Sequence, residues 1–152
     1  MGFSITGLVI AAMIFAPNLL FIAFVPKNIP EGIKDAGLLF TVVERIGQAG
    51  CMVLLVISKD NFEAASIDVW FFLMMICIVV YYCLWIRYFV QGRDFSLLFK
   101  PLGFIPIPMA IFPVLAFSFA AIWGKSVWIG ISAILLAIGH FANSWNIYKH
   151  LR

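Results

Sequence analysis

The chain has few charged residues. Only 11% of its 152 residues are Asp, Glu, Lys or Arg, whereas 64% are hydrophobic. A soluble domain carries roughly 25% charged residues, so this chain has too few to cover a surface that faces water. No polar segment is long enough to form a separate soluble domain. The composition therefore predicts a single integral membrane domain over residues 1–152.

The chain also lacks the residue spacings of common metal and nucleotide sites. Its cysteines, Cys51, Cys77 and Cys83, form no CxxC pair, and His140 and His150 lie too far apart to share one helix face. There is no GxSxG, HExxH, P-loop or GxGxxG motif. We therefore expect no cofactor and no bound metal, and we interpret the cysteines as small packing residues.

The chain does have five long apolar runs of 21–23 residues. At 1.5 Å per residue, such runs give helices ~31–35 Å long, enough to cross a bilayer. Backbone N–H and C=O groups must be paired in lipid, which favours helices. The first run lacks the basic region that precedes a cleavable signal peptide, so we expect it to remain as a helix. The sequence thus predicts an all-α, polytopic membrane protein with five transmembrane helices, at residues 3–25, 37–57, 68–90, 101–123 and 127–148.

Lysines and arginines are distributed unevenly between the two predicted sides of the membrane. One side holds seven of them and the other holds two, with Arg45 inside a run. The excess favours a cytoplasmic C-terminus and an outer N-terminus, in the plasma (inner) membrane. The net charge of +3 then reflects orientation, and we expect no nucleic-acid partner. The larger group comprises Lys27, Lys34, Arg87, Arg93, Lys100, Lys149 and Arg152, and the smaller one Lys59 and Lys125.

Glu44 and Arg45 are adjacent charged residues inside the second apolar run. Placing an ionised side chain in hydrocarbon costs on the order of 2.5–3.5 kcal/mol by insertion scales, so each needs a partner, water or a functional role. Neighbouring residues on a helix diverge and do not face each other. We therefore expect Glu44 to bind or release a cation or proton. Arg45 either holds an anionic group or tunes Glu44.

The unusual residues of all five runs share one layer. Counting inward from the cytoplasmic ends at 1.5 Å per residue, they lie ~8–14 Å deep. Helical spacing also gives two polar stripes, one of which runs from Thr41 through Glu44 and Gln48, and the other from Ser132 to His140. We therefore predict one polar pocket in the inner half of the bilayer. The residues in this layer are Asn18, Glu44, Tyr81, Tyr82, Pro106, Pro108 and His140.

Several polar side chains have two interpretations. Gln48, His140 and Asn143 could orient a ligand, or they could form a buried network that fixes helix register. Asn18 follows Pro17, so it could contact the ligand or satisfy the backbone acceptor that this proline frees.

The remaining pocket candidates are apolar or aromatic. Tyr81 lies too deep for the aromatic belt and is expected to form a pocket wall, whereas Trp85 and Tyr88 are expected to anchor the inner interface. Pro106 and Pro108 each remove a backbone hydrogen bond, so they should break the fourth helix. The break either lines the pocket or only serves packing.

These features favour a small transporter, or a ligand-binding membrane component, with a link to protons or a cation. Its expected partners are the bilayer, a small-molecule or ion ligand, and further copies or a larger membrane complex. One alternative is an integral membrane enzyme that acts on a lipid-soluble substrate with Glu44 and His140 as acid and base. Another is a structural subunit of a membrane complex.

Overall fold

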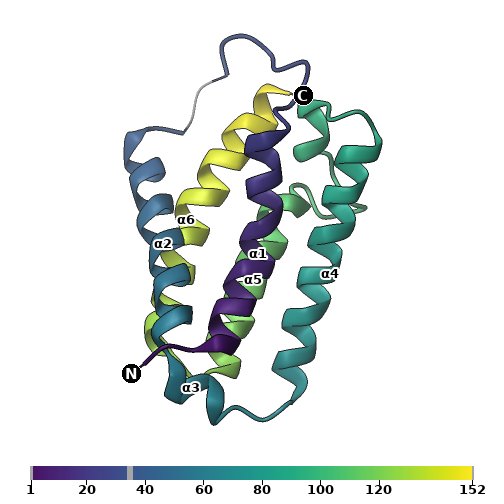
Figure 1. Ribbon diagram of the computed structural model, residues 1–152. Coiled ribbons are helices and arrows are strands. Elements are labelled where there is room, and N and C mark those ends of the chain that lie inside the picture. Colours follow the sequence, from purple (N-terminus) through teal and green to yellow (C-terminus); the bar gives the residue numbers. More distant parts are fainter. Residues whose placement is uncertain (1, 34–35, 152) are drawn as a thin grey trace.

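The chain forms a bundle of helices (Figure 1). The computed structural model describes residues 2–33 and 36–151; it is 74% helical, and the described residues contain no strand. The prediction of an all-α fold is therefore confirmed. Lys34 and Arg152, which contribute to the orientation argument, lie outside the described residues.

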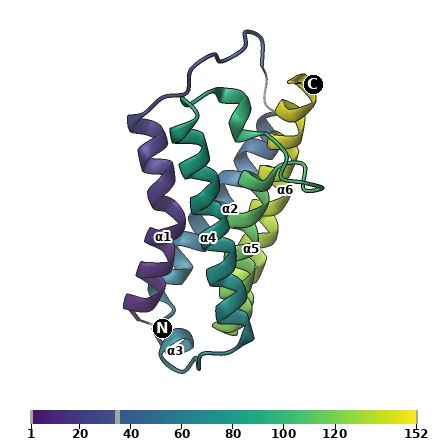
Figure 2. The ribbon, with the colours of Figure 1, turned by 90° about the vertical axis from the view of Figure 1, so that its right-hand side faces the viewer.

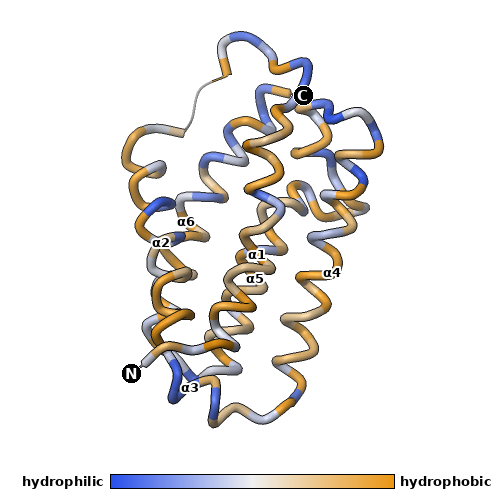
Figure 3. Tube along the Cα trace, viewed as in Figure 1, coloured by the Kyte–Doolittle hydropathy of each residue, from blue (hydrophilic) through white to orange (hydrophobic). Residues whose placement is uncertain are grey.

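Four helices are long and apolar enough to cross a membrane, as judged by length and composition. Their bounds agree with four of the predicted spans to within two residues at every end. Apolar segments fill the middle of the bundle, and hydrophilic segments gather at its two ends (Figure 3). This distribution is that of a membrane protein. The four helices are α1 (Ile5–Ala23), α2 (Leu38–Ile57), α4 (Val69–Val90) and α6 (Val127–His150).

The fifth apolar helix, α5 (Pro108–Trp123), is shorter than predicted. Its 16 residues span ~24 Å, less than a hydrocarbon core of ~30 Å. The predicted start at residue 101 is wrong, because Leu102 and Ile105 close a turn through two 3.0 Å backbone bonds around Gly103, whose φ is +59°. Pro108 then begins the helix, where a missing N–H costs nothing. The expected break is thus a late helix start, preceded by the short helix η1 (Phe95–Leu98).

The helices pack as neighbours in a ring. α2 lies along α6, α6 along α5, and α5 along α4. α1 closes one face, where it lies between α2 and α4 (Figures 1 and 2). A short helix, α3 (Lys59–Glu63), follows α2 at the end of the bundle that carries the N-terminus. Asn61 in α3 donates to the Gly124 carbonyl over 2.8 Å, which ties α3 to the turn between α5 and α6.

Two glycines allow α2 and α6 to approach closely. A Cβ at Gly47 would collide with the backbone of Leu136, and a Cβ at Gly139 would collide with the backbone of Glu44. Small residues at such positions let membrane helices come into backbone contact. The close approach determines which α2 side chains can reach α6.

Backbone hydrogen bonds hold α1 at its two ends. The Ser4 N–H donates to the Val56 carbonyl over 2.7 Å at one end. At the other, the Lys27 N–H donates to the Arg93 carbonyl over 2.8 Å, and the Phe95 N–H donates to the Lys27 carbonyl over 2.9 Å. Between these ties, α1 contacts α4 sparsely.

Candidate functional site

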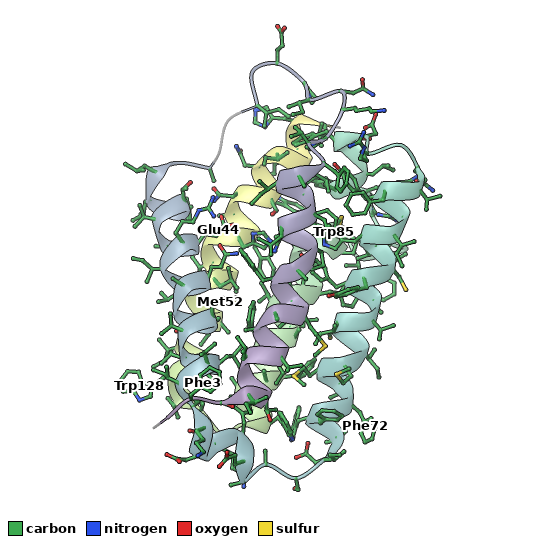
Figure 4. All side chains as sticks on the ribbon, viewed as in Figure 1. Phe3, Glu44, Met52, Phe72, Trp85 and Trp128 are labelled. Carbon is green, nitrogen blue, oxygen red and sulfur yellow. The ribbon has the colours of Figure 1, made fainter. Side chains whose placement is uncertain are left out.

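A cavity of about 430 Å³ lies inside the bundle and is lined by residues from α1, α2, α4, α5 and α6. It lies nearer the end with the C-terminus, at the level of Glu44 and Trp85 (Figure 4). The structure places six of the candidate polar and aromatic residues in its walls. They are Asn18, Glu44, Arg45, Gln48, Tyr81 and His140.

Glu44 is held by two side chains of α6. Its Oε1 lies 2.7 Å from His140 Nδ1, and its Oε2 accepts from Asn143 Nδ2 over 2.6 Å. His140 and Glu44 are both half-buried, with 30% and 21% of their side chains exposed. Both carboxylate oxygens therefore already have partners, although one side of the pair remains open to the cavity.

Asn143 does not line the cavity. It is buried behind Glu44, and its Oδ1 accepts from the Ala36 N–H over 3.1 Å. The polar network thus connects α2, α6 and the segment that leads into α2. Of the two interpretations of Asn143, the geometry favours a network role over direct contact with a ligand.

The local sequence explains this network. His140 and Asn143 are three residues apart on α6, so their side chains lie on the same helix face. Gly139 brings the Glu44 backbone against that face. A carboxylate on α2 can therefore reach both α6 side chains.

Arg45 also lines the cavity but is bound to nothing in the described part of the chain. Its side chain is exposed, and no ion pair joins it to Glu44 among the described residues. The divergence expected for neighbouring helix positions explains this separation. Gln48, one turn further along α2, likewise has no hydrogen-bond partner among the described residues.

The α4 wall is aromatic. Tyr81 is 3% exposed, and its hydroxyl donates to Asn18 Oδ1 over 3.4 Å. The Trp85 ring meets Tyr81 edge-on, with 6.2 Å between ring centroids. The Trp85 Nε1 is buried and interacts with the Tyr81 hydroxyl.

Trp85 and Tyr88 correct one expectation from the sequence. Both are buried, at 6% and 0% exposed, instead of lying at the membrane surface as belt residues. Trp85 is a cavity residue that the sequence did not reveal, because its depth in the span is that of a belt residue. The spacing Tyr81-x-x-x-Trp85 on one helix face was the available signal.

Pro106 and Pro108 do not form the cavity wall. Pro108 is fully buried, and the wall is formed by their neighbours Ile107 and Met109 together with Pro113. The helix break therefore borders the cavity through apolar side chains. Sequence reasoning located the break but not which residues face inward.

Pro17 frees the Met13 carbonyl, and the structure shows which group satisfies it. The Tyr82 hydroxyl donates to Met13 O over 2.8 Å. Asn18 therefore does not perform this repair, and its side chain faces the cavity and Tyr81. The donor comes from another helix, which the chain order does not reveal.

No family model, curated protein or solved structure matches this chain. Among the described residues, no group of three or more His, Cys, Asp or Glu side chains could hold a metal ion.

The arrangement can accommodate a small molecule. Ligand pockets measure roughly 300–1,000 Å³ and are mainly apolar, with a few polar groups that fix orientation. Here α1, α4 and α5 supply mainly apolar and aromatic walls, while α2 and α6 supply most of the polar groups. Such a site suits a ligand with an apolar body and a polar end.

Proposed function

We propose that this protein is a small integral membrane transporter, or a ligand-binding membrane component, whose ligand occupies this cavity. The observation that carries the proposal is the cavity of about 430 Å³ between five helices, with charged and amide side chains on one wall. Ionisable residues at membrane depth mark functional sites by default. A chain of this composition has little reason to keep Arg45 there without a bound partner.

The proposal includes five membrane crossings. α5 completes the fifth crossing together with the non-helical segment 99–107 that precedes it. Non-helical backbone at membrane depth is tolerated where it is buried in protein or lines a cavity. Phe99 and Ile107, at the two ends of this segment, both line the cavity, which supports this arrangement for the ends. Residues 100–104 between them are exposed, so the proposal places this stretch at the membrane interface.

We also propose that the end of the bundle with the cavity faces the cytoplasm, across the plasma (inner) membrane. Lys27, Arg93, Lys100 and Lys149 follow or end helices at that end, and the opposite end has Lys59 and Lys125. Labelling of K149C and K125C by a membrane-impermeant thiol reagent, in a background without the native cysteines, tests this. The proposal expects intact cells to be labelled at position 125 only, and labelling at 149 alone would reverse it.

Ligand identification from the purified protein tests the function itself. Ala110 lines the cavity and is 3% exposed, so Ala110→Phe should fill the space. Ala49→Phe places the same side chain on the exposed face of α2 and is the matched control. We expect a small molecule to co-purify with the wild-type chain and with A49F but not with A110F. Equal recovery from all three would contradict a ligand in this cavity.

A proton link is proposed from the Glu44–His140 contact, because a hydrogen bond between a carboxylate and an imidazole nitrogen requires a proton between them. Replacing Glu44 by Gln removes the group that can gain or lose that proton. Transport of the co-purifying ligand into proteoliposomes should then lose its pH dependence. An E44Q protein that keeps the wild-type pH profile would exclude coupling through this residue.

An integral membrane enzyme is the second candidate, and one observation favours it. Glu44 binds His140 Nδ1, which leaves Nε2 as the nitrogen able to exchange a proton with a substrate. Incubation of the co-purified ligand with the protein in detergent, where no gradient exists, separates the classes. Product formation favours the enzyme, and binding without product favours the transporter or binding component.

A structural subunit is the third candidate. The Glu44–His140–Asn143 network locks α2 to α6 within one chain. On this alternative, E44Q and His140→Ala would disturb assembly of a larger complex, while the wild-type chain would bind no small molecule.

A further inference from the structure

The polar groups of the cavity are not balanced between donors and acceptors. Its one carboxylate, Glu44, already accepts at both oxygens from α6. Arg45 brings the five N–H donors of a guanidinium and no acceptor, and none of these donors is bound within the described structure. The cavity therefore holds a guanidinium that makes no salt bridge in the described structure. The nearby Glu44 attracts it electrostatically, but both Glu44 oxygens are already bonded to α6.

One more donor without a partner in the described structure lies in the cavity wall, on Asn18. Asn18 uses its Oδ1 to accept from Tyr81, which leaves its Nδ2 free to donate. The Trp85 Nε1–H is fully buried and interacts with the Tyr81 hydroxyl, so it is not available to a ligand. Gln48 lies three residues after Arg45, close enough on the helix surface for both side chains to contact one ligand group.

We propose that the ligand is an amphipathic anion, and that its oxyanion head binds the Arg45 guanidinium with Gln48 and Asn18 beside it. This deepens the proposed function and depends on it. A carboxylate or phosphate matches the planar fork of a guanidinium, which can donate two parallel hydrogen bonds to it. The same anion supplies the counter-charge that Arg45 needs at membrane depth.

The remaining walls suit the apolar part of such a molecule. Phe15 and Phe21 of α1 and Phe117 of α5 line the cavity, as do Ile14 and Val114. These side chains offer no group that would bind a second charge. A cationic ligand fits less well, because Arg45 in the same wall would repel it and each Glu44 oxygen already accepts one hydrogen bond from α6.

Competition between three probes of equal chain length tests the inference. Full-length protein is placed in phosphatidylcholine nanodiscs, and binding of radiolabelled decanoate is measured after subtraction of protein-free nanodiscs. Unlabelled decanoate, decanol and decylamine then compete. A hydrogen bond to a charged group contributes enough for about tenfold or more in affinity, so decanoate should compete at least that much better than decanol. Decylamine should compete least.

Substitutions test whether the preference for decanoate over decanol depends on Arg45. Arg45→Gln should abolish the advantage of decanoate over decanol, and Arg45→Lys should keep part of it, because lysine retains the charge but not the fork. Arg93→Gln removes the same charge from a residue that lies over Phe24 and outside the cavity wall, so it should change nothing. Glu44→Gln should leave decanoate binding equal or tighter, because it removes a nearby negative charge.

The outcomes separate the inference from the function on which it rests. Equal competition by decanoate and decanol, or an advantage that survives Arg45→Gln, overturns the anionic ligand while leaving a binding cavity. Strongest competition by decylamine, lost in Glu44→Gln, shows a cation site and also overturns it. If no probe binds, the inference fails, and the proposed function fails with it only if nothing co-purifies with the wild-type chain.

A membrane phospholipid could also supply the oxyanion that binds Arg45. One further experiment distinguishes a phospholipid from a smaller amphipathic anion. Nanodiscs that contain phosphatidylglycerol present a lipid phosphate with a net negative charge. If this lipid displaces decanoate from the wild-type protein but does not alter decanol binding to R45Q, the oxyanion at Arg45 belongs to a lipid. If it displaces nothing, the ligand is a smaller amphipathic anion.

Discussion

The two sides of the bundle treat polar side chains in opposite ways. Where α2 meets α6, Gly47 and Gly139 bring the backbones together, and Glu44 reaches partners on the other helix. Where α1 meets α4, aromatic rings such as Phe21 and Trp85, 5.9 Å apart, separate the helices. Arg45 and Gln48 face this wider space and make no hydrogen bond in the described structure, whereas Tyr81 and Asn18 bond to each other across it. Helix separation therefore decides which polar residues form a network and which remain available to a ligand.

Replacing Gly47 by Ala should cause the largest loss of stability, because it disturbs the close contact between α2 and α6. The added Cβ meets Leu136 backbone, which cannot rotate away. Overpacking of this kind typically costs 1–3 kcal/mol, and we expect about 3 here. Thermal or denaturant unfolding of the protein in nanodiscs provides the measurement.

Gly130→Ala is the matched control for Gly47→Ala. A Cβ at Gly130 meets only Ala121 Cβ, at 3.9 Å, which is an ordinary contact. Alanine is also the better helix former by about 1 kcal/mol. This variant should be neutral or slightly stabilised, and equal losses for both glycines would show that the α2–α6 approach is not tight.

Two amide side chains allow the polar network to be compared with the cavity wall, because Asn143 belongs to the network and Gln48 to the wall. Asn143→Leu removes a donor to Glu44 and the acceptor of the Ala36 N–H, so it should cost about 2 kcal/mol in the free energy of unfolding. Gln48→Leu removes an amide that has no partner among the described residues, and it should cost close to nothing. Unfolding of the two variants under the same conditions measures the difference. A larger loss for Gln48 than for Asn143 would reverse the assignment of network and cavity.

The sequence predicted the polar layer because helical spacing and depth are properties of one helix at a time. Glu44, Gln48 and His140, which it assigned to two polar stripes, line the same cavity in the structure. The sequence could not say that Glu44 would bind both His140 and Asn143, because that depends on the distance between two helices. Gly139 held the relevant clue, since a glycine beside a polar stripe permits close approach.

The wrong helix start at residue 101 and the missing partner of Tyr82 also arise because hydropathy and helical spacing describe one segment at a time. The predicted span 101–123 relied on hydropathy, and a turn formed by Leu102 and Ile105 is as apolar as a helix. Gly103 and the two prolines after it were the physical signals against a helix start at residue 101. Tyr82 was not assigned a partner, because its acceptor lies on α1, far away in the sequence.

Tyr82→Phe tests how α1 is held on its open side. It removes the donor to Met13 O, which Pro17 leaves without its usual helical partner. Hydrogen bonds between membrane helices average about 0.6 kcal/mol, with a maximum near 1.7, so we expect a loss of about 1 kcal/mol. In a Pro17→Ala background the residue 17 N–H can donate to Met13 O, and the same Tyr82→Phe change should cost less. Equal losses in both backgrounds would show that the hydroxyl does not compensate for the proline.

The smallest expected effect concerns the loop that ties α1 to the end of α4. The Asp94 carboxylate accepts from the Ser96 hydroxyl over 2.6 Å, from Asn28 Nδ2 over 2.9 Å and from the Ser96 N–H over 2.9 Å. These bonds, in that order, hold the pKa of Asp94 below its usual value. A lowered pKa in the folded state means that the stabilisation is fully present above about pH 4 and is lost as the pH falls through the lowered pKa. Unfolding midpoints between pH 6 and pH 3 should therefore fall more steeply for the wild type than for Asp94→Asn, which cannot titrate. Because the Asp94 carboxylate is open to solvent, the difference should be small, and parallel curves would show that its charge contributes nothing to holding α1 against α4.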